Sequence, residues 1–114
     1  MSVELISQFL TKYHQANLVS FNNHIEMIKS KSQLNKEELE KLVDDSKYSL
    51  QSDFNSNLYK IAEEINFDLD IEIKHPFIED LQVKLIDLLT IMSIHSTNKV
   101  ILEWFDTETK KLIS

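Results

Sequence analysis

The sequence predicts an all-α protein, a helical bundle of about four helices that begins with a long antiparallel hairpin and contains one short strand-like segment. Apolar residues recur at steps of three and four along most of the chain, which is the period of a helix with one buried side. The chain has no glycine and a single proline, so few residues interrupt its helices. Because it has 114 residues, 42% hydrophobic and 27% charged, we expect one helical domain over residues 1–114.

The first predicted helix runs from about residue 3 to residue 31. Ser2 can cap its start, and Lys29 and Lys31 suit the negative end of its dipole. Asn17 fills a gap in its apolar stripe. That stripe consists of Val3, Ile6, Leu10, Tyr13, Phe21, Ile25 and Ile28.

The second predicted helix runs from about residue 35 to residue 66 and has a clear start. Asn35 is followed three residues later by Glu38, the spacing of a capping box. Two long helices joined by a few residues form an antiparallel hairpin. Each helix would be more than about 40 Å long, whereas a compact chain of this size has a radius of gyration of about 13 Å. The hairpin is therefore expected to protrude, bend or pack against a second copy. The apolar stripe of this helix is Leu39, Leu42, Val43, Leu50, Phe54, Leu58, Ile61 and Ile65.

Residues 67–74 break the helical period, because apolar and charged residues alternate strictly there. A period of two is typical of a half-buried strand. A lone strand cannot satisfy its backbone hydrogen bonds, so it needs a partner: residues 100–105, a second copy, or another protein. An extended crossover between helices explains the pattern equally well. The alternative fold class is α+β, with residues 67–74 and 99–105 in a small sheet.

Two shorter helices are predicted in the C-terminal third, over about residues 76–96 and 99–113. Pro76 suits the first turn of a helix, where its missing N–H costs nothing. The polar run 96–98 offers a turn and a cap between the two helices. Trp104 and Phe105 are adjacent and point about 100° apart on a helix, so both are central core residues only if the helix is largely covered.

Three absent residue types narrow the functional classes. Without glycine the chain lacks Walker-type and dinucleotide-type phosphate-binding loops, and without cysteine it has no disulfide, thiol nucleophile or thiolate metal site. None of its twelve basic residues is arginine and its formal charge is −7, so no direct nucleic-acid binding is expected. No apolar run approaches about 18 residues and no basic region precedes an apolar block at the N-terminus. We expect a cytoplasmic protein without membrane contact.

No residues show the pattern of a catalytic or cofactor site. His95 stands beside Ser96, but adjacency alone does not make a catalytic dyad. Glu72 and His75 form half of a carboxylate–histidine metal motif, and a single pair does not complete a coordination shell. The four histidines are therefore interpreted as surface or seam residues. We expect a protein that is not an enzyme and that holds no metal or cofactor.

Several polar residues lie on or beside the apolar stripes of the first two helices. Polar residues in a helix seam can fix register and oligomeric state. The simpler interpretation, which we favour from the sequence, is that they lie at the solvated boundary of the stripes. The set comprises Asn17, Ser20, His24, Ser46, Ser49, Asp53 and Asn57.

The acidic residues are unevenly distributed and suggest a function. Residues 34–80 carry a net charge of −8, whereas the flanking segments are close to neutral. Such a surface can attract a basic partner and speed its encounter, although a solvated acidic face also serves solubility alone. The sequence favours a non-enzymatic protein that binds another protein with a basic surface, of the inhibitor, immunity, antitoxin or anti-defence type. The alternative is a homo-oligomeric helical scaffold, such as a homodimer. The candidate partner-binding residues are Asp44, Asp45, Asp68, Asp70, Glu72, Glu79, Asp80 and Trp104.

Overall fold

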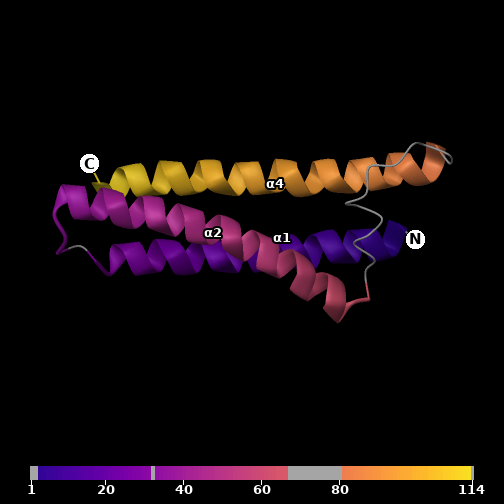
Figure 1. The fold of residues 1–114 in the computed structure, drawn as a ribbon, viewed down its shortest axis with the longest axis horizontal. Coiled ribbons are helices and arrows are strands. Elements are labelled where there is room, and N and C mark those ends of the chain that lie inside the picture. Colours follow the sequence, from indigo (N-terminus) through magenta and orange to yellow (C-terminus); the bar gives the residue numbers. More distant parts are fainter. Residues whose placement is uncertain (1–2, 32, 67–80, 114) are drawn as a thin grey trace.

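The computed structural model describes residues 3–31, 33–66 and 81–113, which form an elongated helical bundle. Its helices are α1 (Val3–Lys29), α2 (Lys36–Glu64) and α4 (Leu81–Ile113). The helices α1 and α4 run in the same direction, and α2 runs antiparallel to both (Figure 1). The prediction of an all-helical bundle is confirmed for these residues, none of which lies in a strand.

The connection between α1 and α2 is short and well capped. Asn35 is the N-cap of α2, and its side chain accepts a 2.8 Å hydrogen bond from the backbone N–H of Glu38. In return the Glu38 carboxylate accepts a hydrogen bond from the backbone N–H of Asn35 at 3.4 Å. The capping box predicted from the sequence is therefore present. It satisfies backbone groups that the start of a helix otherwise leaves without a partner.

The C-terminal third differs from the prediction of two helices separated at residues 96–98. Residues 81–113 form one continuous helix, and Ser96, Thr97 and Asn98 lie inside it. Short polar residues favour turns because their side chains compete for backbone hydrogen bonds. Here the Asn98 side chain instead bonds to side chains on α1. The alternative α+β fold with a strand over residues 99–105 is wrong, because those residues are helical, and residues 67–74 and Pro76 lie outside the described residues.

The great length of the hairpin is matched by α4. With 33 residues, α4 is about 50 Å long at 1.5 Å per residue. The molecule measures 56 × 25 × 16 Å and has a radius of gyration of 17.0 Å. The three helices lie side by side along this long axis, so α4 covers the hairpin within the same chain (Figure 1).

Among the residues whose side chains are described, the buried apolar side chains form two separate clusters along the bundle. The cluster nearer the α1–α2 connection, here called the hairpin cluster, is built around the fully buried residues Leu50 and Phe105. The other, here called the N-terminal cluster, is built around Phe9 and Tyr13, whose rings stack at 5.7 Å. The hairpin cluster comprises Ile25, Ile28, Leu39, Val43, Leu50, Phe54, Ile101 and Phe105, and the N-terminal cluster comprises Phe9, Tyr13, Ile61, Ala62 and Ile94.

The adjacent aromatic residues of α4 divide between core and surface. Phe105 is fully buried, whereas Trp104, on an uncovered side of the same helix, is 50% exposed. Helical geometry requires such a division when only one side of a helix is covered.

Candidate functional site

Five polar side chains from all three helices form a continuous chain of hydrogen bonds in the middle of the bundle. Asn17 of α1 donates to the Asn98 side-chain oxygen on α4 at 2.9 Å and accepts from the Asn57 amide on α2 at 3.0 Å. The Asn98 amide donates to the Tyr13 hydroxyl oxygen at 2.9 Å. The Asn57 amide also donates to the Ser20 hydroxyl oxygen at 3.3 Å. We call these five residues the polar layer.

Asn17 is the centre of the polar layer and has no exposed surface. Both ends of its amide are satisfied, one by each neighbouring helix. A buried amide without a partner costs about 1–3 kcal/mol. A slip of one helical turn, about 5.4 Å, would separate Asn17 from both of its partners. The polar layer therefore favours one alignment of the three helices over its neighbours.

The expectation that the polar residues of the stripes lie at a solvated boundary is wrong for those at the centre of the bundle. Asn17 and Ser46 are buried, and Ser20 and Asn57 are half-buried rather than freely solvated. It holds for Ser49, which is exposed on α2. The sequence pattern alone cannot separate the two cases, because a small rotation of the helix moves a stripe residue between core and edge.

Two ion pairs and one histidine–carboxylate contact join the described helices at the edge of the bundle, and one of the ion pairs joins Lys12 of α1 to Glu64 of α2 at 3.6 Å. His24 of α1 lies 2.9 Å from the Asp53 carboxylate of α2. Lys47 of α2 lies 2.9 Å from the Asp106 carboxylate of α4. Two of these contacts join α1 to α2 and one joins α2 to α4, so together they add to the alignment that the polar layer specifies.

Two members of the polar layer were not identified from the sequence. Asn98 was assigned to a turn, and Tyr13 was assigned only to the apolar stripe. The missed signal is a shared spacing. Asn98 lies four residues after Ile94 and three before Ile101. Asn17 similarly lies four residues after Tyr13 and four before Phe21. An asparagine in the gap of an apolar stripe on two helices predicts a shared layer, provided that both helices are continuous.

The acidic excess of the described helices lies on α2. This helix carries eight acidic residues and four lysines, whereas α1 and α4 each carry equal numbers of both signs. Tyr48 and Tyr59 are 77% and 58% exposed on it. They are eleven residues apart, close to three helical turns, so they project from the same side. We call the exposed side opposite the buried stripe the outer face of α2, comprising Glu37, Glu38, Lys41, Asp44, Asp45, Tyr48, Tyr59 and Glu63.

The predicted partner-binding residues are only partly brought together. Asp44 and Asp45 are exposed on the outer face of α2. Trp104 is exposed on α4, a different helix. The exposed Tyr48 and Tyr59 were not among the residues predicted from the sequence. The remaining candidates, Asp68, Asp70, Glu72, Glu79 and Asp80, lie outside the described residues.

Among the described residues, His14 is the one titratable group whose pKa departs clearly from its ordinary value. Its ring lies 5.6 Å from that of Tyr13. Both ring nitrogens are buried, and neither has a hydrogen-bond partner among the residues that the structure describes. Burial lowers the pKa of His14 below its ordinary value of 6.5, because the imidazolium ion would lose hydration.

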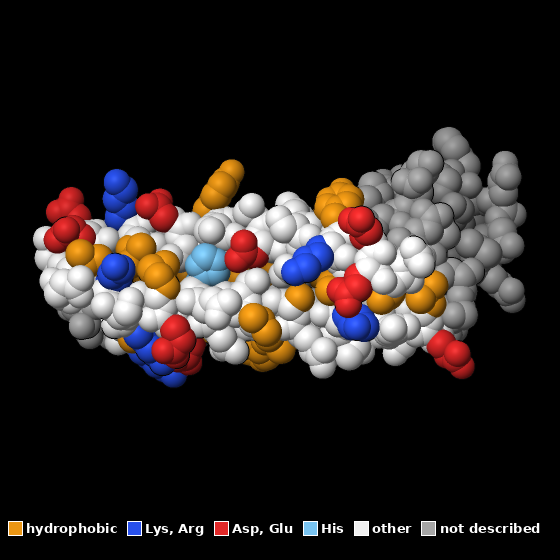
Figure 2. All heavy atoms as spheres, turned by 90° about the horizontal axis from the view of Figure 1, so that it is seen from below, with side chains coloured by type: hydrophobic (Ala, Val, Ile, Leu, Met, Phe, Trp, Pro, Cys, Tyr) orange, Lys and Arg blue, Asp and Glu red, His pale blue; other side chains and the backbone are white. Residues whose placement is uncertain are grey.

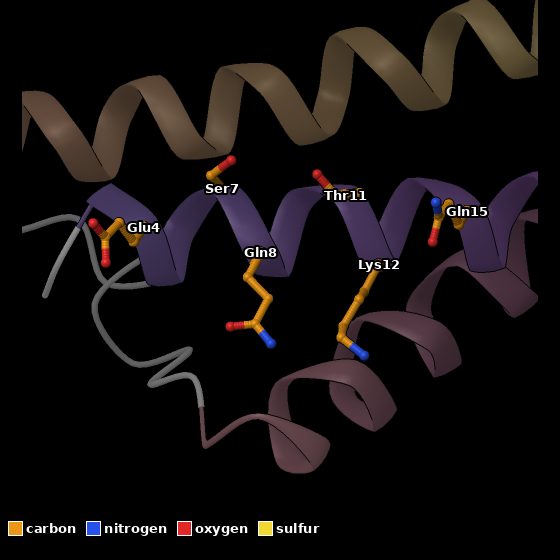
Figure 3. A pocket seen from close by; sticks show the side chains of 6 residues that line it. All are labelled: Glu4, Ser7, Gln8, Thr11, Lys12 and Gln15. Carbon is orange, nitrogen blue, oxygen red and sulfur yellow. The ribbon is translucent and has the colours of Figure 1, made fainter.

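The described residues carry open surface depressions and no cluster of three potential metal ligands. Among them no three histidine or acidic side chains gather as metal ligands, and the Glu72–His75 pair lies outside them. A shallow depression on α1 is lined by polar side chains of that helix alone, and they spread over its surface rather than converge (Figure 3). None of the described helices is long and apolar enough to span a membrane.

Comparisons with known proteins give no relative from which a function could be transferred. No protein family, curated protein or solved structure matches the chain.

Proposed function

We propose that this chain is a non-enzymatic protein that binds another protein with a basic surface, and neutralises or chaperones it, through the outer face of α2. The inhibitor, immunity, antitoxin or anti-defence classes fit this mode of action. One observation carries the proposal: two exposed tyrosines share a helix face with exposed carboxylates, on the helix that holds the acidic excess. Tyrosine is enriched at protein interfaces, and a charged rim steers encounter with an oppositely charged partner.

In this proposal the tyrosines and the carboxylates of the outer face of α2 have different roles in binding. Tyr48 and Tyr59 offer large rings that can be buried with little loss of conformational freedom. Asp44 and Asp45 lie one helical turn before Tyr48 and supply the negative potential. Binding through such a face should weaken as salt is added, because exposed charges are screened beyond about 10 Å at 0.1 M salt.

Quantitative affinity capture from the native host tests the proposal. The wild type is compared with a variant that combines D44N, D45N, Y48A and Y59A, at about 50 mM and 300 mM salt. A matched control combines E103Q and W104A on α4. We expect a lysine-rich or arginine-rich protein that the wild type and the control retain at low salt and that the α2 variant loses.

The outcome separates the faces of the bundle. Loss of the captured protein with the α4 control alone would move the interface to Trp104. Equal capture by wild type and α2 variant at both salt concentrations would refute the role of the outer face of α2. Circular dichroism of each variant establishes that its helices are intact.

The alternative function is a homo-oligomeric scaffold, and exposed apolar residues of α4 favour it. Val100 and Trp104 are 40% and 50% exposed and lie one helical turn apart. Figure 2 views the molecule from the side away from α4, and on that side apolar side chains are scattered among charged ones. Light scattering behind a sizing column distinguishes the proposals. A dimer that persists in high salt and dissociates in V100E favours the scaffold, and a monomer favours the binding protein.

A further inference from the structure

The asparagine and serine members of the polar layer lie between the two apolar clusters on every helix, and its fifth member, Tyr13, also belongs to the N-terminal cluster. On α1 the polar residues Asn17 and Ser20 separate Tyr13 from Ile25, which belong to different clusters. On α2, Asn57 lies between Phe54 and Ile61. Among the described residues, the polar layer therefore interrupts the core between α1 and α2 and between α1 and α4.

The same interruption occurs on α4. Asn98 lies between Ile94 of the N-terminal cluster and Ile101 of the hairpin cluster. One helical turn from Ser20 and Asn57, the largely buried His24 side chain contacts the partly exposed Asp53 carboxylate between α1 and α2.

A polar cross-section changes how a bundle opens. Continuous apolar packing makes the loss of one contact weaken its neighbours, so an apolar core tends to open as one unit. Amide and hydroxyl groups of the polar layer can exchange their protein partners for water when one side opens. Opening on one side of the layer then need not expose the apolar residues on the other side.

We infer that the polar layer divides the bundle into two units that open separately, one around the N-terminal cluster and one around the hairpin cluster. Opening of the first unit exposes Phe9, Ile61 and Ile94 while the capped connection between α1 and α2 stays folded. Opening of the second leaves the stacked rings of Phe9 and Tyr13 in place. The division is a conformational property of the fold and does not depend on the proposed binding function.

Native-state hydrogen exchange of the full chain tests the inference, with a matched pair of variants on α4. I94A and I101A remove the same group from buried positions on either side of Asn98. We expect I94A to accelerate exchange at least tenfold at the amides of Tyr13 and Ile61, and to leave the amides of the hairpin cluster unchanged. We expect the reverse for I101A.

The inference is overturned if either variant accelerates exchange in both clusters and the two accelerations agree within a factor of two. The bundle then opens as a single unit. If a variant fails to fold, exchange of the wild type is measured at low concentrations of denaturant. Two units predict that the exchange rates of the two clusters rise differently with denaturant, and a single unit predicts that they rise alike.

A third variant ties the division to the polar layer. Combined replacement N17L, N57L and N98L makes the cross-section apolar and keeps the side chains similar in size. In this background we expect the effect of I94A to spread to the hairpin cluster. If the effect stays confined to the N-terminal cluster, the polar layer does not cause the division.

Discussion

Asn17 on α1 links all three helices, because its side-chain amide donates a hydrogen bond to α4 and accepts one from α2. Its burial would destabilise the fold if either partner were missing. The neighbouring apolar clusters supply the driving force for folding, and the polar layer selects one arrangement of the helices.

Replacing Asn17 by alanine should lower the free energy of unfolding by about 2–4 kcal/mol, because two amides lose a partner and a cavity remains. Urea unfolding followed by circular dichroism measures the change. Asn55→Ala, at an exposed position on α2, is the control and should change stability by no more than about 0.5 kcal/mol. A loss of less than about 1 kcal/mol at Asn17 would contradict a structural role for the polar layer.

His14 should make the bundle sensitive to mild acid. Burial lowers its pKa in the folded chain below the value of 6.5 expected when it is unfolded. The unfolded chain therefore takes up the proton first, and stability contributed by neutral His14 is lost as the pH falls through 6.5 towards the folded pKa.

Urea unfolding at about pH 7.5 and pH 5.5 checks this sign. His14→Gln should lose less stability than the wild type between the two pH values, and His95→Gln, at an exposed position, should behave as the wild type. Identical pH dependence in the wild type and His14→Gln would show that this histidine does not destabilise the fold in acid.

At the scale of elements, local signals predicted helix starts better than helix continuity. The start of α2 depends on two residues three apart, Asn35 and Glu38, and both bonds of the capping box form. The continuity of α4 depends on residues far away in sequence, because Asn98 is held by Asn17 and Tyr13. Local patterns cannot reveal such partners, and this explains why one helix was predicted as two.

The capping box gives a prediction for α2. Asn35→Ala should lower the free energy of unfolding by about 1 kcal/mol, because the backbone N–H of Glu38 loses its acceptor. Gln33→Ala in the preceding connection is the matched control. Equal unfolding midpoints for both variants in urea would mean that the cap contributes nothing to α2.

The apolar stripes predicted most of the core of α2 and left gaps in that of α1. Leu39, Val43, Leu50 and Phe54 are buried as their spacing indicates. Phe9 is fully buried although it was left out of the stripe of α1, because the core of that helix faces two neighbours and is wider than one stripe.

At the scale of the whole molecule, shape and charge follow from three long helices packed side by side. The radius of gyration of 17.0 Å exceeds the value of about 13 Å for a compact chain, because each helix spans most of the long axis. The sequence predicted long helices but not that α4 would cover the hairpin. The negative charge of the described helices was predicted in the region of α2, and the structure adds two exposed tyrosines to the same face.

Site-specific photo-crosslinking in the native host tests the proposed binding face most directly. A photoreactive amino acid replaces Tyr48 on the outer face of α2 or, as the control, the exposed Val19 on α1. We predict that position 48 gives a covalent adduct with a basic protein, that position 19 does not, and that D44N with D45N reduces the adduct. An adduct from position 48 that is undiminished when both carboxylates are replaced, or no adduct from the folded protein at that position, would contradict the account.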